Sequence, residues 1–107
     1  MSSIRDQLTE IHARIARAVE AAEADSGATP ALKAVVQEFH RVSHKAMGAA
    51  AVIDAQATLA PILELEQAGD SAKVAAMACP RISDETRRAI VAAHDAVSEL
   101  KAESTDG

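Results

Sequence analysis

An apolar stripe through residues 32–53 constrains the fold of this chain more than any other feature. Its members alternate in steps of three and four, the spacing of one face of an α-helix: Leu32, Val35, Phe39, Val42, Ala46, Ala49 and Ile53. Thr29 and Pro30 precede the stripe, a helix cap followed by the residue favoured at the first helical position. We therefore expect a helix that begins at Pro30 and buries Phe39, the only aromatic residue of the chain.

Two more stripes of the same spacing predict helices toward the two ends of the chain. The first has Ser2 or Ser3 as its cap, ends near Ala24 or Asp25, and contains Ile4, Leu8, Ile11, Ile15, Ala18 and Ala22. The last follows a Ser83 cap and contains Ile90, Ala93, Val97 and Leu100.

The middle of the chain is harder to divide. An unbroken helix from Pro30 to Ala68 would be about 58 Å long, too long for a domain of this size. We therefore expect a break between Gly48 and Pro61. A third helix then ends at Gly69, and a short segment, 72–79, is closed by Pro80.

Together these patterns predict an all-α fold in one domain, 1–107, with residues 103–107 as a frayed tail. Short loops favour an antiparallel helical bundle of about four main helices. Ala makes up about a quarter of the chain, and small side chains fill little space in a core. We therefore expect a homodimer that buries further apolar surface, with Val36, Met47 and Val52 as the candidates.

Composition excludes several classes of function. The net charge of −5 and the single aromatic residue argue against nucleic-acid binding. The N-terminus lacks the apolar region of a signal peptide, and the longest apolar run, 46–53, is too short to span a bilayer. The one cysteine, Cys79, cannot form an internal disulfide and is expected to pack in the core. The simplest interpretation is a cytoplasmic bacterial protein with no membrane partner and no cofactor.

His40 and His44 stand four residues apart on the second predicted helix. At about 100° per residue they point roughly 130° and 170° away from the centre of its apolar stripe, so we expect both on the outer face. They are either solvated polar residues or functional ones. Histidines four apart can share a metal ion, but no third ligand stands beside them. We expect no metal site, with His40 and His44 as its ligands if one exists.

The segment His44-Lys45-Ala46-Met47-Gly48-Ala49-Ala50, with Leu65-Glu66 and Ala68-Gly69-Asp70 further on, resembles the histidine phosphotransfer (Hpt) domain family over about a quarter of the chain. Hpt domains are four-helix bundles that pass phosphoryl groups to aspartates of response-regulator receiver domains. The resemblance implies that His44 is the phosphoacceptor and that Gly48 lets a partner approach. The family's motif has a lysine three residues after its histidine, where this chain has Met47. We name His40 as a further supporting candidate.

Two functional hypotheses follow. The first is a small non-enzymatic helical interaction or regulatory protein whose partner is a second copy of itself or another protein. The alternative is an Hpt-like phosphocarrier that acts through His44 and a receiver domain. No catalytic triad or glycine-rich phosphate loop is recognisable in the chain.

Overall fold

The computed structural model describes residues 4–50 and 59–106, and these form four α-helices: α1 (Ile4–Ala24), α2 (Pro30–Ala50), α3 (Leu59–Met77) and α4 (Asp84–Asp106). The described residues contain no strand. The prediction of an all-α fold with four main helices is therefore confirmed. Helix α4 continues to Asp106. The fraying expected for residues 103–107 is a statement about motion and stays a prediction.

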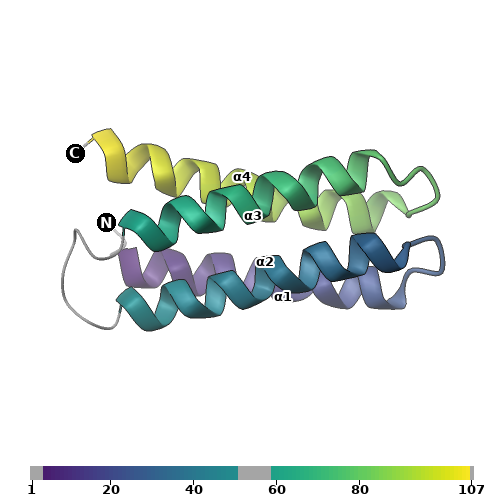
Figure 1. Cartoon of the computed structure of the whole chain (residues 1–107), viewed down its shortest axis with the longest axis horizontal. Coiled ribbons are helices and arrows are strands. Elements are labelled where there is room, and N and C mark those ends of the chain that lie inside the picture. Colours follow the sequence, from purple (N-terminus) through teal and green to yellow (C-terminus); the bar gives the residue numbers. More distant parts are fainter. Residues whose placement is uncertain (1–3, 51–58, 107) are drawn as a thin grey trace.

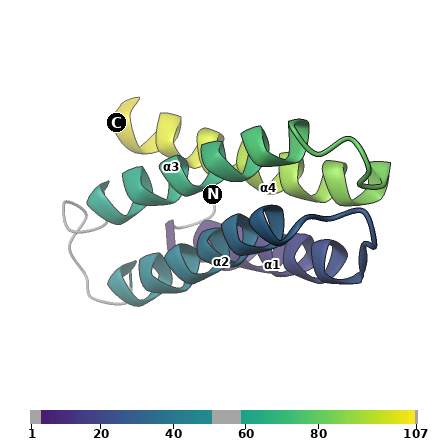
Figure 2. The same ribbon diagram turned by 45° about the vertical axis from the view of Figure 1, so that its right-hand side comes forward.

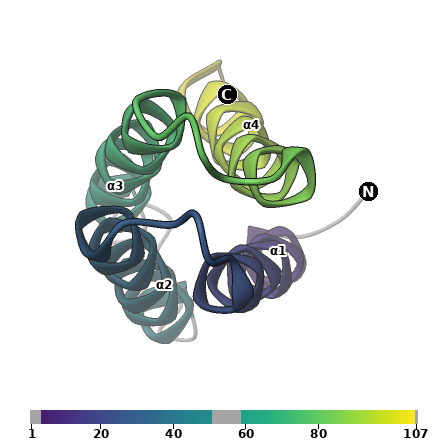
Figure 3. The ribbon, with the colours of Figure 1, turned by 90° about the vertical axis from the view of Figure 1, so that its right-hand side faces the viewer.

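Successive helices run in opposite directions along the long axis of the molecule, which measures 41 × 22 × 21 Å (Figure 1). Each helix packs against its neighbours in sequence, and α4 closes the bundle by packing against α1. Figure 2 shows the pairing of α1 with α2 and of α3 with α4 from a second side. Seen end on in Figure 3, the four helices surround one common interior.

The stripes of α1 and α4 face this interior as the sequence predicts. Leu8, Ile15 and Ala18 of α1 are buried there, as are Ile90 and Val97 of α4. Burial of such aliphatic side chains is the main stabilising contribution to the bundle. Cys79, just beyond α3, is buried as expected, and its thiol donates to the carbonyl oxygen of Gly27 at 3.4 Å.

The buried face of α2 is rotated from the predicted one. Phe39 is fully buried, but Val36 and Ser43 are buried as well, whereas Val35 is only half-buried. Both positions 35 and 36 are valine, so spacing alone could not choose between them. The prediction that Val36 is dimer surface is therefore wrong, and Met47 packs half-buried against the core. Val52 and Ile53, named above, lie outside the described residues.

The prediction that the third helix ends at Gly69 is also wrong, because α3 continues to Met77. A Cβ atom at Gly69 would lie 3.1 Å from Cζ of Phe39. Glycine here makes room for the one aromatic ring instead of ending a helix. Pro61 falls in the first turn of α3, where its missing N–H leaves no helical hydrogen bond unmade.

Asp25 follows α1 directly and connects the loop between α1 and α2 to the loop between α3 and α4. Its carboxylate accepts hydrogen bonds from the backbone N–H groups of Ser83 (2.9 Å) and Gly27 (2.8 Å) and from the hydroxyl of the buried Thr86 (2.7 Å). The backbone of Ser83 contributes most, followed by the Thr86 hydroxyl, and together these donors lower the pKa of Asp25 to about 2. A Cβ atom at Gly27 would lie 2.0 Å from the carbonyl oxygen of Arg81, so the loops touch through backbone.

Two predicted helix caps are present near this joint. The Thr29 hydroxyl accepts from the N–H of Leu32 at 3.1 Å, and the Ser83 hydroxyl accepts from the N–H of Thr86 at 3.2 Å. These bonds confirm the predicted starts of α2 and α4. The proposed Ser2 or Ser3 cap of α1 lies outside the described residues.

Candidate functional site

His44 is exposed on α2, as predicted. Gly48, one turn further along, is also exposed, and a Cβ atom there would meet no other atom within 4 Å. The surface beside the His44 imidazole is therefore open on the side of Gly48. This arrangement gives a partner protein room to approach the ring.

His40 is less exposed than predicted. The buried face of α2 includes Val36 and Ser43, so it lies closer to His40 than the apolar stripe of the sequence implied. Its side chain is half-buried, and its ring centre lies 4.7 Å from that of His12 on α1, with the two planes tilted by 35°. The ring of His44 lies 6.0 Å from the same His12 ring. The structure thus brings together three imidazoles from two helices, and the sequence had predicted only the pair on α2.

The hydroxyl of buried Ser43 holds His12 in place. It lies 2.8 Å from Nδ1 of His12 and donates its single hydrogen to the carbonyl oxygen of His40 at 2.7 Å. Because that hydrogen is used, Nδ1 of His12 must be the donor in the other bond. Burial, followed by the charges of His40 and His44, lowers the pKa of His12. The neutral ring therefore carries its hydrogen on Nδ1 and a free lone pair on Nε2.

The cationic side chains near His44 on α2 are paired with carboxylates. Lys45 lies 3.2 Å from Glu64 of α3, and Nε of Arg41 donates to Glu38 at 3.0 Å. The bonds with Arg41 lower the pKa of Glu38, and those with Glu38 raise the pKa of Arg41. Met47 stands where the Hpt motif has its lysine, and it packs toward the core. The position that would supply a cation near His44 in the Hpt motif is therefore occupied by the apolar Met47.

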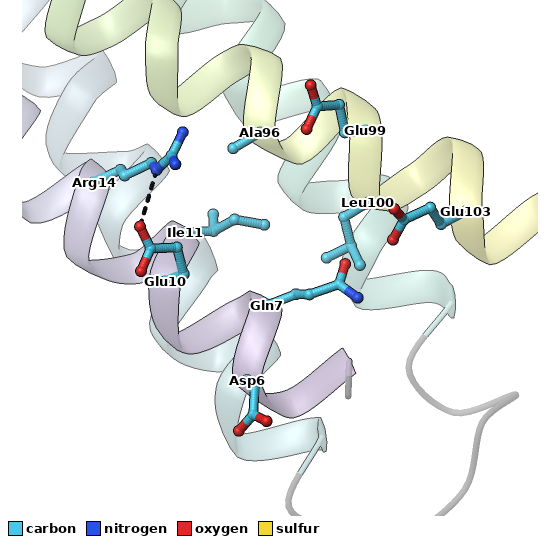
Figure 4. Close-up of a pocket in the computed structure, with 9 residues that line it drawn as sticks. All are labelled: Asp6, Gln7, Glu10, Ile11, Arg14, Ala96, Glu99, Leu100 and Glu103. Atoms are coloured by element: carbon cyan, nitrogen blue, oxygen red, sulfur yellow. Dashed lines mark hydrogen bonds and ion pairs between the residues drawn. The ribbon is translucent and has the colours of Figure 1, made fainter. Parts of the chain in front are cut away.

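A second polar region is a surface cavity of about 480 Å³ between α1 and α4 (Figure 4). Four carboxylates line it, from Asp6, Glu10, Glu99 and Glu103. The fifth charge, on Arg14, is bound to Glu10, one helical turn before it, at 3.3 Å. The negative charge of this lining disfavours anionic ligands. Sequence alone could not identify it, because the acidic residues come from opposite ends of the chain.

His94 lies between two carboxylates at the seam of α3 and α4. Its Nε2 is 2.8 Å from Asp70 and its Nδ1 is 3.0 Å from Asp95. Both ring nitrogens are thus already engaged, which leaves no free nitrogen for a nucleophile or a ligand. Across residues 4–50 and 59–106, no group of three or more His, Cys, Asp or Glu side chains is arranged as a metal site as it stands.

The outer side of α3 is apolar near its C-terminal end. Val74 is 67% exposed and Met77 is 68% exposed, values high for large apolar side chains. A hollow of about 400 Å³ is lined by Val74, Ala75, Ala78 and two polar residues, Asp70 and Ser71. Leu63, nearer the start of α3, is 40% exposed. The apolar pattern of the sequence predicts a contact surface at Val36, Met47 and Val52 and does not indicate this face of α3.

Comparison with protein-family models, curated proteins and solved structures finds no match to this chain. None of the helices in the described residues is both long enough and apolar enough to cross a membrane. The molecule is thus a four-helix bundle with an exposed histidine on α2 and an apolar face on α3, and its function must be inferred from these features.

Proposed function

We propose that this chain is a small non-enzymatic helical interaction protein that forms a homodimer through the outer face of α3. The observation that carries the proposal is the exposure of Val74 and Met77 on adjacent turns of one helix. Clustered apolar side chains on a surface favour association, because contact with a partner removes them from water.

The shape of this face supports a second copy as the partner. It carries both a protruding side chain, Met77, and a hollow beside Val74 and Ala75. In a twofold dimer the same surface is used by both copies, so each Met77 is able to fill the hollow of the other. The thioether side chain is unbranched and adapts to such irregular spaces.

The test is sedimentation velocity on the full chain at high micromolar concentration, comparing Val74→Glu with Ala92→Glu. Ala92 is exposed on α4, so its variant adds the same charge away from the proposed interface. We expect a dimer for the wild type and for Ala92→Glu. An unpaired carboxylate in the interface should weaken dimerisation of Val74→Glu by at least about tenfold. A wild-type chain that sediments only as an 11.1 kDa species would reject the proposal.

A second candidate function, an Hpt-like phosphocarrier, is favoured by the exposed His44 beside the open surface at Gly48. A receiver aspartyl phosphate would pass its phosphoryl group to an imidazole nitrogen of His44. A P–N bond would form as the P–O bond breaks, and the aspartate would leave as a carboxylate. The partner implied is a response-regulator receiver domain.

Phosphohistidine detection after incubation with phosphorylated receiver domains or a histidine kinase tests this second function. His44→Ala should abolish labelling, whereas His40→Ala should leave most of it. Met47→Lys restores the cation of the Hpt motif and should increase labelling only if His44 is the acceptor. Absence of labelling in both the wild type and Met47→Lys would reject the phosphocarrier function and leave self-association through α3 as the proposed function.

A further inference from the structure

Three of the four histidines of the chain gather on the α1–α2 face: His12 of α1, and His40 and His44 of α2. The centre of the His12 ring is 4.7 Å from that of His40 and 6.0 Å from that of His44. An imidazole nitrogen binds Zn²⁺ at about 2.0–2.1 Å, which places two ring centres on one tetrahedral ion roughly 5 Å apart. The two observed distances between ring centres, 4.7 Å and 6.0 Å, lie just below and just above this expected distance.

The rings do not form a metal site in their present orientations. His12 and His40 lie against each other with a tilt of 35°. Within the part of the chain that the structure describes, neither His40 nor His44 makes a hydrogen bond through its ring. Both rings are therefore able to turn without breaking a hydrogen bond, and His44 is exposed.

The hydrogen bond to Ser43 engages Nδ1 of His12, so Nε2 is the nitrogen of this ring that remains available to a metal. Its Nδ1–H donates to the hydroxyl of Ser43, which is itself fixed by the carbonyl oxygen of His40. Metal-binding histidines commonly donate their second nitrogen in this way, which fixes the tautomer and the direction of the ring. The nitrogen that remains, Nε2, carries the lone pair that binds a metal.

We propose that His12, His40 and His44 bind one borderline transition-metal ion of the Zn²⁺, Ni²⁺ or Cu²⁺ class, with Ser43 as the residue that positions His12. Neutral imidazole is a preferred ligand of these ions, whereas Mg²⁺ and Ca²⁺ prefer oxygen. Histidines at positions i and i+4 of one helix reach the same ion, and His12 supplies the third nitrogen from α1. Water occupies the remaining coordination positions. Binding would link α1 to α2 and is independent of the α3 dimer.

Isothermal titration of the metal-free full chain with Zn²⁺, Ni²⁺, Cu²⁺ and Mg²⁺ tests the site. We expect one transition-metal ion per chain, tightest for Cu²⁺, and no binding of Mg²⁺. His12→Ala, His40→Ala and His44→Ala should each weaken binding at least tenfold, and Ser43→Ala about 10–100-fold. His94→Ala is the matched control, because that histidine is engaged by Asp70 and Asp95, and it should leave affinity unchanged.

Helical circular dichroism verifies that each variant is folded. If His12→Ala does not fold, nitrogen NMR of the wild-type imidazoles replaces it, with metal-induced shifts expected at Nε2 of His12 and at both α2 histidines. Binding that survives His12→Ala, or shifts confined to His40 and His44, would show a helix-surface pair and overturn the three-histidine site. No binding by the wild type, or equal loss in His94→Ala, would also overturn it.

Discussion

Replacement of Gly69 by alanine tests the packing of α3 against the core most sharply. Glycine in a helix interior costs about 1 kcal/mol relative to alanine, so Gly69→Ala would stabilise an uncrowded helix. Here the new Cβ atom would lie 3.1 Å from Cζ and 3.3 Å from Cε1 of Phe39. The Phe39 side chain is fully buried, so it has little room to move away.

Forcing an extra methyl group into such a contact costs about 1–3 kcal/mol. After the gain in helix propensity is subtracted, we expect Gly69→Ala to lower the free energy of unfolding by about 0–2 kcal/mol. In a Phe39→Leu background the ring is gone, so the same substitution should instead stabilise by about 1 kcal/mol. The two sites should therefore be coupled by roughly 1–3 kcal/mol in a double-mutant cycle.

Urea unfolding of the four proteins of this cycle measures these values. Gly48→Ala is the control, because its Cβ atom meets nothing within 4 Å, and it should stabilise by up to about 1 kcal/mol. The reasoning would be refuted if Gly69→Ala stabilised the wild type as much as it stabilises Phe39→Leu.

Three further predictions follow from burial and charge. Phe39→Ala should lower the free energy of unfolding by about 3–5 kcal/mol, because the ring is fully buried; an unchanged thermal midpoint would contradict its place in the core. His44→Ala should change the free energy of unfolding by no more than about 0.5 kcal/mol, because the side chain is exposed; a larger loss in urea unfolding would show an unrecognised contact. Asp25→Asn should lower the thermal midpoint. Because the pKa of Asp25 falls from 3.8 to about 2 on folding, the ionised carboxylate favours the folded state. Its contribution should be complete above pH 3.8 and decline as the pH falls toward 2, so the midpoints of wild type and variant should converge over that range. If the difference in thermal midpoint between wild type and Asp25→Asn stayed the same from pH 6 to pH 2, the stabilising role of the ionised Asp25 carboxylate would be contradicted.

Local sequence signals predicted the elements that depend on one helix alone. The stripes of α1 and α4 and the caps at Thr29 and Ser83 were predicted because each involves residues close together in sequence. The sequence determines the buried face of α2 less closely than those of α1 and α4, because the adjacent residues Val35 and Val36 fit two orientations of the helix. That rotation is the reason His40 is half-buried while His44 remains exposed.

The features that the sequence did not reveal depend on two helices at once. A glycine such as Gly69 is typical of a helix end in the sequence, but in the structure it lies inside α3 against Phe39 of α2. The approach of His12 to His40 depends on the register between α1 and α2, which no spacing within either helix encodes. The apolar face of α3 was missed because Val74 and Met77 were expected in a short, separate segment.

The most direct test of the proposed function is an isotope-filtered NOE experiment on a mixture of labelled and unlabelled chains at high micromolar concentration. Such an experiment records only contacts between different copies. The α3 dimer predicts intermolecular NOEs from the methyl groups of Val74 and Met77, including contacts of Met77 with Ala75 or Ala78 of the other copy. Absence of intermolecular NOEs, or NOEs confined to other helices, would contradict the proposal that this bundle self-associates through α3.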